Sequence, residues 1–148
     1  DVEFSITMIG EPALKKDRDY EQKLKLLISE LGLQGGFNFL GKINHRDLIP
    51  YYQSHHLFIH LSKTGSLDKT ILEAMACGMN VLSSNDSVRA FLPEDLLFNE
   101  NDLEELADKI LNLNKNNINT ELRNYVMKNH NLDRLINKIG DIILSKED

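Results

Sequence analysis

The chain of 148 residues has one cysteine, no long uncharged apolar run and no cluster of basic residues. A single cysteine, Cys77, excludes a disulfide within the chain. A membrane-spanning helix needs roughly 18 or more consecutive apolar residues, and no stretch approaches that length. The charged, apolar and cleavage pattern of a signal peptide is also missing. With a net charge of −6 and no basic patch, non-specific binding to nucleic acid is disfavoured. These absences favour an ordinary globular protein.

Two specific motifs are missing as well. No G-x-G-x-x-G follows the first predicted strand, which argues against a dinucleotide-dependent dehydrogenase. His55, His56 and His60 lie close together, but they lack metal-ligand geometry. Adjacent residues of an extended segment point to opposite faces, and no cysteine or carboxylate joins the histidines at ligand spacing. We therefore predict no metal site and interpret His60 as a buried histidine.

What the chain does contain is an alternation of short apolar runs and amphipathic stretches. The runs predict strands at residues 4–10, 37–41, 57–61, 80–82 and 96–98. Helical periodicity predicts helices at residues 20–31, from Asn44 or His45 onward, and at 67–77, 88–92, 102–113, 120–129 and 132–144. This order predicts an α/β fold, a Rossmann-like doubly wound parallel sheet with helices on both faces and a helical C-terminal tail. Residues 1–148 are expected to form a single domain.

The stretch 61–84 joins a strand end, a polar turn at 62–66, a helix and a second strand. A helix that begins at the carboxyl end of a parallel strand presents unpaired N–H groups and the positive end of its dipole, where phosphates bind. Ser66 and Asp68 are candidate caps, and Lys69 adds a cation beside the same amides. This turn is the predicted anion site.

Glu73 is the exceptional residue of that helix. Its neighbours in ILEAMACG are apolar or small, and an ionised carboxylate seldom lies in such surroundings without a partner. Two interpretations stay open. Glu73 faces solvent or pairs with Lys69 at i, i+4 spacing, or it accepts hydrogen bonds from the hydroxyls of a ligand.

The run LEAMACGMNVLSS resembles the signature of the group-one, retaining nucleotide-sugar glycosyltransferases of the GT-B fold. The resemblance implies that the chain is the donor-nucleotide-binding domain of such an enzyme and that Glu73 binds the ribose. An earlier family glutamate, which contacts the transferred sugar, falls at Gly65. The Gly-Phe-Gly that usually follows is replaced by Ser66, Leu67 and Asp68. Asp68 supplies the missing carboxylate, or the sugar contact is absent.

The resemblance also implies further contacts with the donor. The backbone around Leu67–Lys69 would hold the diphosphate, the loop after residue 41 would meet the base, and the loop at Gly10 would lie near the ligand. The candidate binding residues are Gly10, Gly41, Lys42, Ile43, Gly65, Ser66, Leu67, Asp68, Lys69, Thr70 and Glu73. The loop 83–87 is implied to face the donor, with Asn85 and Ser87 as candidates. No residue of the chain can be assigned as a nucleophile or general base.

The implied activity is retaining transfer of a sugar from a nucleoside diphosphate to an acceptor, in the synthesis of surface polysaccharide or lipopolysaccharide. The nucleotide sugar is the donor substrate, and no cofactor is expected.

The Arg and Lys with which the family binds the donor phosphates have no counterpart here. We therefore expect a fragment that lacks the acceptor domain, which would bind a glycan or lipid-linked acceptor, and the first βα unit. On its own such a chain is expected to be inactive. The implied location is the cytoplasm, with peripheral attachment to the inner membrane face left open. Two alternatives remain: a degenerate nucleotide-sugar-binding module that does not catalyse, and a nucleotide-sugar epimerase on the same scaffold.

Overall fold

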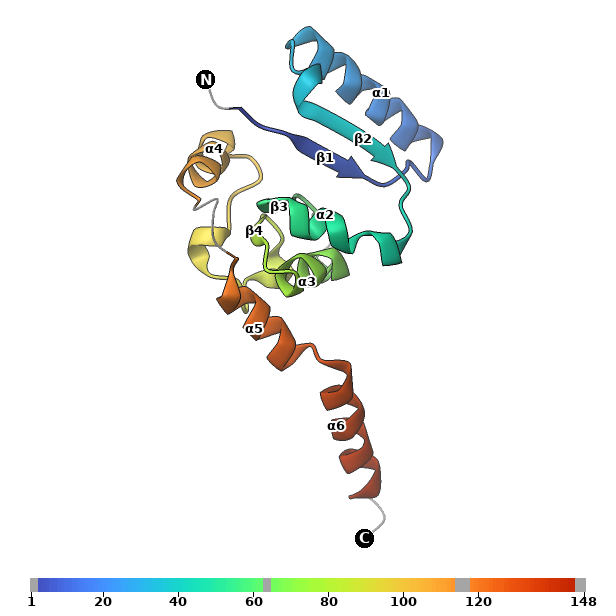
Figure 1. The fold of residues 1–148 in the computed structure, drawn as a ribbon, viewed down its shortest axis with the longest axis vertical. Coiled ribbons are helices and arrows are strands. Elements are labelled where there is room, and N and C mark those ends of the chain that lie inside the picture. Colours follow the sequence, from blue (N-terminus) through green and yellow to red (C-terminus); the bar gives the residue numbers. More distant parts are fainter. Residues whose placement is uncertain (1–2, 63–64, 114–117, 146–148) are drawn as a thin grey trace. The chain divides into compact units, whose positions relative to one another are not determined.

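The computed structural model describes residues 3–62, 65–113 and 118–145 (Figure 1). The chain divides into two compact units, Asp1–Leu48 and Ile49–Asp148. Each unit contains a pair of parallel strands joined by a helix-containing crossover. Two neighbouring strands can run parallel only if a long crossover, usually a helix, connects them. The alternation of strands and helices predicted from the sequence therefore leads to parallel pairing. The predicted α/β class with parallel strands is confirmed.

In the first unit, strand β1 (Ile6–Ile9) pairs with β2 (Phe37–Gly41), and helix α1 (Lys15–Glu30) connects them. A short 3-10 helix, Gln34–Gly36, precedes β2, and a second one, His45–Asp47, closes the unit. The register is regular up to Met8 and shifts by one residue at Ile9. The amide of Gly10 donates to the carbonyl oxygen of Gly41 at 2.8 Å, so the two strand ends are joined.

Helix α1 begins at Lys15, several residues before the start predicted at position 20. The missed signal is Asp17. Its carboxylate accepts a hydrogen bond from the backbone N–H of Leu14 at 3.0 Å. An acid at the third helical position can satisfy the amide that precedes a helix in this way. Because the first turn is polar, apolar periodicity detected only the later part of α1.

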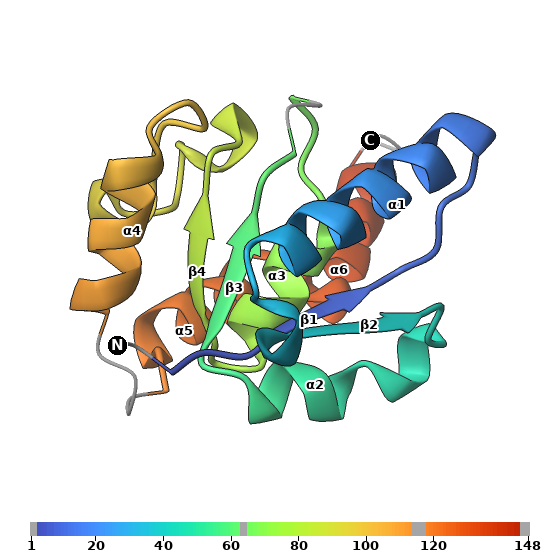
Figure 2. The ribbon, with the colours of Figure 1, turned by 90° about the horizontal axis from the view of Figure 1, so that it is seen from above.

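The second unit begins with helix α2 (Ile49–Ser54) and continues with strand β3 (Leu57–His60), helix α3 (Lys69–Ala76) and strand β4 (Asn80–Ser83). The two strands run side by side in the same direction (Figure 2). Their register is regular from Leu57 opposite Asn80 to His60 opposite Ser83. Both strands therefore end at the same edge, immediately before the two loops that carry the predicted site.

The hydrophobic core lies in the second unit. Its fully buried members include Ile71, Ala74 and Met75 on α3 and Val81 and Leu82 on β4. Helix α5 (Thr120–Asn129) packs on α3 and adds Leu122 and Val126. Helix α3 is thus packed against the strands and against α5, which fixes its N-terminal turn at the edge of the sheet.

The segment that follows β4 differs from its prediction. In place of the helix predicted at 88–92, the chain forms a 3-10 helix at Asp86–Val88. Asn85 is its N-cap, and the Asn85 side chain accepts from the N–H of Ser87 at 2.8 Å. The predicted strand at 96–98 is wrong. Glu94–Leu96 forms another 3-10 helix, and only Leu97 makes a parallel bridge, with Ser83. Pro93, at the N-cap of that helix, leads the chain into a turn that leaves too little length for a strand.

The C-terminal part is helical, as predicted. Helix α4 (Leu103–Asn112) is capped by Asp102, α5 by Asn119, and α6 (Leu132–Leu144) by Asn131. These caps bond the first-turn amides of each helix.

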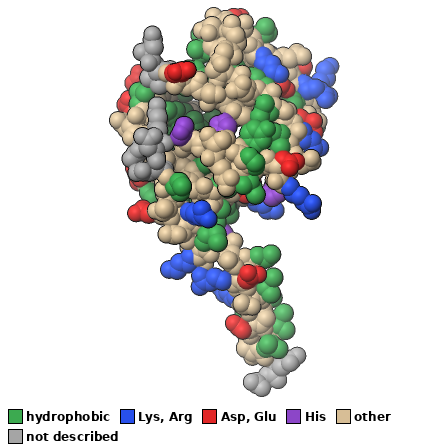
Figure 3. All heavy atoms as spheres, viewed as in Figure 1, with side chains coloured by type: hydrophobic (Ala, Val, Ile, Leu, Met, Phe, Trp, Pro, Cys, Tyr) green, Lys and Arg blue, Asp and Glu red, His purple; other side chains and the backbone are tan. Residues whose placement is uncertain are grey.

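The apolar stripe of α6 is exposed. Its side chains keep roughly half or more of their surface open to solvent, and Figure 3 shows hydrophobic side chains along this helix. The exposed members are Leu132, Leu135, Ile136, Ile139, Ile142 and Ile143. In the part of the chain that the structure describes, this stripe does not pack into the hydrophobic core. None of the helices in the described ranges combines the length and apolar character that membrane crossing requires.

Candidate functional site

The N-terminus of α3 lies at the carboxyl edge of β3 and β4. Asp68 occupies the N-cap with an extended backbone, but its side chain makes no capping hydrogen bond. Instead its carboxylate lies 2.7 Å from Nε2 of His60. The Asp68 side chain therefore accepts no hydrogen bond from the first-turn amides of α3, although its N-cap position would allow one. This arrangement leaves the positive end of the helix dipole facing the loop, as an anion site requires.

His60 connects the helix start to the end of β4. The imidazole is 7% exposed, which confirms its interpretation as a buried histidine. Its Nδ1 lies 3.3 Å from the hydroxyl of Ser83, which also accepts from the amide of Asn85 at 3.1 Å. Together with the Asp68 contact, these bonds tie both strand ends and the turn into one network.

The turn before α3 is held by the loop that follows β4. The carbonyl oxygen of Ser66 accepts from Nδ2 of Asn85 and from the hydroxyl of Ser87, each at 3.1 Å. Asn85 and Ser87, expected to face a ligand, thus serve to position the turn. Gly65, Ser66 and Leu67 are exposed within it. Lys63 and Thr64, part of the predicted turn, lie outside the described residues.

Glu73 lies one turn into α3 and is half-buried. Its Oε2 accepts a hydrogen bond from the hydroxyl of Tyr52, on α2, at 3.1 Å. No ion pair joins it to Lys69 among the described residues, so the i, i+4 interpretation is not the one the structure adopts. Lys69 and Thr70 are exposed at the start of the helix.

The Glu73 region also affects neighbouring groups. Burial, together with the charge of and hydrogen bond to Glu73, raises the pKa of the Tyr52 phenol well above its ordinary value. Burial likewise raises the pKa of the Cys77 thiol, with Glu73 adding to the increase and Arg123 opposing it. The Tyr52 phenol therefore keeps its proton near neutral pH and can donate a hydrogen bond, and Cys77 has little thiolate character. Over the part of the chain that the structure describes, no three His, Cys, Asp or Glu residues are placed to hold a metal ion.

A hollow of about 150 Å³ lies beside Gly65. It is lined by Gly65, Ser84, Asn85, Asp86 and Glu100. The hydroxyl oxygen of Ser84 is buried and makes no hydrogen bond to the residues that the structure describes. Two acidic residues, Asp86 and Glu100, thus line the hollow beside Gly65. Asp68, one of the two alternatives considered for the missing sugar contact, is not among the residues that line the hollow, and its carboxylate bonds His60.

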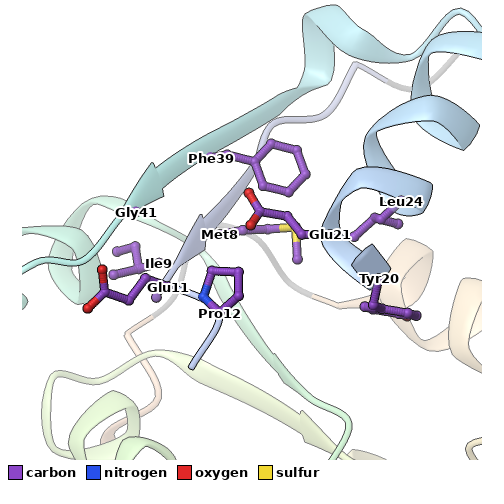
Figure 4. Close-up of a pocket in the computed structure, with 10 residues that line it drawn as sticks. Met8, Ile9, Glu11, Pro12, Tyr20, Glu21, Leu24, Phe39 and Gly41 are labelled. Carbon is purple, nitrogen blue, oxygen red and sulfur yellow. The ribbon is translucent and has the colours of Figure 1, made fainter. Parts of the chain in front are cut away.

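The first unit has a hollow of its own, of about 160 Å³, at the carboxyl ends of β1 and β2. Gly10 and Gly41 both line it, so the structure brings these two predicted residues together. Figure 4 shows Tyr20, Glu21 and Leu24 of α1 on one side, with Met8 and Phe39 of the strands on the other. The walls are largely apolar.

The remaining predicted residues of the first unit lie just beyond that hollow. Lys42 pairs with Glu11 at 3.3 Å, and both side chains are mostly exposed. Ile43 is half-buried. Neither residue is among those that line the hollow.

Sequence reasoning missed Tyr52, Asp86 and Glu100. Tyr52 lies on the short helix α2, and its ring packs against the core. A half-buried glutamate implies a donor nearby, which is the signal that could have led to Tyr52. Asp86 begins a short 3-10 helix and Glu100 lies in a turn, and the local pattern there carries no information on long-range contacts.

Comparison with known proteins defines the class. The model of the family described as glycosyl transferases, group 1, matches residues 1–133. An uncharacterized glycosyltransferase of Methanocaldococcus jannaschii is 27% identical over 131 residues, which are 82% of this chain and 33% of the relative. The chain belongs to the group 1 glycosyltransferases, as the EAMACG run indicated.

Solved structures share the fold. Anabaena HepE in complex with UDP has a TM-score of 0.83 at 21% identity, over 96% of this chain and 41% of that one. Sucrose-phosphate synthase from Thermosynechococcus elongatus has a TM-score of 0.76 at 21% identity, over 94% and 37%. These are GT-B enzymes, and the Rossmann-like class predicted for the chain is confirmed by the match. The chain thus spans about a third to two fifths of these relatives.

Proposed function

We propose that this chain binds the nucleoside diphosphate sugar of a retaining glycosyltransferase of the hexosyltransferase type. The acceptor is a glycan or a lipid-linked glycan bound by another part of the enzyme, and the product belongs to surface polysaccharide or lipopolysaccharide synthesis. The nucleotide sugar is itself the donor substrate, without a cofactor. The enzyme acts in the cytoplasm or at the inner membrane face.

One observation carries the proposal: the first turn of α3, which has no side-chain cap from Asp68, begins at the shared carboxyl edge of β3 and β4 with Glu73 one turn further on. Ligands of open parallel sheets bind outside this edge. The amides of Leu67–Lys69 and the ammonium of Lys69 would hold the diphosphate, and Glu73 would accept from the ribose hydroxyls. Ser66 and Thr70 flank these groups.

In the first unit, Gly10, Gly41, Lys42 and Ile43 are proposed donor contacts through their backbone groups. The hollow that Gly10 and Gly41 line supports this, because its apolar walls suit a planar ring and its rim offers peptide groups. The HepE complexes contain UDP and UDP-glucose, which makes uridine the first base to test.

Catalysis by such a site would rest on electrostatics. As the sugar departs, negative charge grows on the diphosphate, and donors already aimed at it stabilise the transition state without reorganising. The hydrogen bonds of Ser66 to Asn85 and Ser87 support this role, since they hold the turn in place before the ligand arrives.

The proposal is tested by thermal-shift measurements on the full-length polypeptide with uridine, guanosine and adenosine diphosphates. A ligand that binds only the folded state stabilises it by RT ln(1 + [L]/Kd), about 2.7 kcal/mol at a concentration 100-fold above Kd. One diphosphate is expected to raise the melting temperature, and its sugar conjugate to support transfer. Stabilisation without transfer would favour the non-catalytic module, and conversion of the donor without an acceptor would favour the epimerase. No shift with any of the three diphosphates would refute donor binding.

Lys69→Ala is expected to weaken binding of the nucleoside diphosphate about 3- to 10-fold while leaving the affinity of the nucleoside unchanged. The reason is that an exposed ammonium beside the helix start interacts with phosphate charge alone, and such partly solvated charge contacts contribute about 1 kcal/mol. Isothermal titration calorimetry with both ligands provides the measurement.

Lys138→Ala is the matched control, because Lys138 is an exposed lysine of α6 and should leave both affinities unchanged. Equal losses for the nucleoside and the diphosphate in Lys69→Ala would mean that Lys69 supports the helix and not the ligand.

A further inference from the structure

Tyr52 and Glu73 come from different helices and meet through their side chains. The phenolic hydroxyl of Tyr52 donates to Oε2 of Glu73 at 3.1 Å, across 21 positions of sequence. The ring of Tyr52 packs against the buried core and lies edge-on to Phe58, with centroids 6.2 Å apart. Packing thus holds the ring, and the ring aims the hydroxyl at the carboxylate.

The electrostatic setting keeps this hydroxyl a donor. Burial raises the pKa of the Tyr52 phenol, and the nearby carboxylate of Glu73 raises it further. A phenol in this setting does not ionise at any physiological pH, and a hydrogen bond to an ionised acceptor is about twice as strong as a neutral one. The Tyr52 hydroxyl therefore keeps its proton and remains able to donate to Glu73.

We propose that Tyr52 is a positioning residue that orients the Glu73 carboxylate toward the two ribose hydroxyls of the donor nucleotide. This inference rests on the proposed function, in which Glu73 is the ribose acceptor. A carboxylate has about four acceptor sites, so accepting from Tyr52 is compatible with accepting from a diol. A glutamate side chain that is already oriented loses less rotamer freedom when the ligand binds, which raises affinity.

A purely structural role predicts a different outcome. If the bond only joins α2 to α3, its removal destabilises the fold and affects every ligand alike. If it orients Glu73, its removal affects only ligands that carry ribose hydroxyls. The ratio of affinities for a ribonucleoside diphosphate and its 2′,3′-dideoxy analogue therefore separates the two roles, because the analogue lacks the groups that Glu73 would bind.

The test is Tyr52→Phe in the full-length polypeptide, with Tyr51→Phe as the matched control. Tyr51 is the adjacent half-buried tyrosine of α2, and within the described ranges the side-chain hydrogen bonds to it go to its backbone carbonyl. Calorimetry would use uridine diphosphate, or whichever of the uridine, guanosine and adenosine diphosphates binds, together with its dideoxy form. Tyr52→Phe is expected to weaken the ribonucleotide about 3- to 10-fold and to leave the dideoxynucleotide unchanged. Tyr51→Phe should change neither.

Equal losses for the two nucleotides, or no loss for either, would overturn the inference, whatever the change in melting temperature. Glu73→Ala, measured alongside, separates this failure from that of the proposed function. If Glu73→Ala removes the preference for ribose and Tyr52→Phe does not reduce it, only the positioning role falls. If Glu73→Ala leaves that preference intact, or if no diphosphate binds the wild-type protein, the ribose site falls and the inference with it.

Discussion

Ile71→Ala is expected to lower the free energy of unfolding by about 2–5 kcal/mol, the usual cost of truncating a fully buried isoleucine. Ile71 is 0% exposed and belongs to the same core cluster as Met75 of α3 and Leu82 of β4. Its loss removes apolar contacts and leaves a cavity that this packing can close only in part. Urea denaturation followed by circular dichroism measures the change.

Leu103→Ala is the control for that experiment. Leu103 lies on α4 and is 76% exposed, so its truncation should change stability by less than about 0.5 kcal/mol. A loss below about 1 kcal/mol for Ile71→Ala would contradict the packing of α3 described above. Below its melting temperature, the variant should bind nucleotide with near-normal affinity. Residues two apart on a helix point about 200° from each other, so Ile71 faces the core while Glu73 faces elsewhere.

Glu73→Ala is expected to weaken binding of the nucleoside diphosphate roughly 10- to 100-fold, because hydrogen bonds to a charged acceptor are worth about 1.5–3 kcal/mol each. Glu73→Gln keeps the shape of the side chain and one acceptor oxygen, so it should fall between Ala and the wild type. Isothermal titration calorimetry gives the affinities, and circular dichroism establishes that both variants remain folded.

Glu104→Ala is the matched control, since Glu104 is an exposed acid in the first turn of α4 and should leave the affinity unchanged. An unaltered affinity in Glu73→Ala would remove the ribose role. Loss of folding in Glu73→Ala but normal binding in Glu73→Gln would instead assign Glu73 to stability, through its bond with Tyr52.

Much of the fold could be predicted because its signals are local. Helices α5 and α6 begin after asparagine caps and follow apolar stripes, and both have the predicted bounds. Strand β2 ends at a glycine, also as predicted. The failures occur where local signals conflict. The strand expected at 96–98 is apolar enough, but the turn that begins at Pro93 shortens it to a single bridge.

The candidate site was predictable to a smaller extent. Its place, a helix start at the edge of a parallel sheet, follows from the order of elements. The hydrogen-bond partners of its side chains do not follow from that order. Asp68 has the sequence position of a cap yet bonds His60, and Asn85 has the loop position of a ligand contact yet bonds Ser66.

The sequence by itself determined the family, the order of strands and helices and the helix that carries Glu73, because periodicity, caps and glycine stops act over a few neighbouring residues. Only the tertiary structure decided that Tyr52 donates to Glu73 and that Asp86 and Glu100 line the hollow beside Gly65. The physical reason is the distance along the sequence over which each interaction acts. A hydrogen bond between side chains on two helices depends on how both pack on the sheet, and that packing is a property of the whole core, not of any short run of residues.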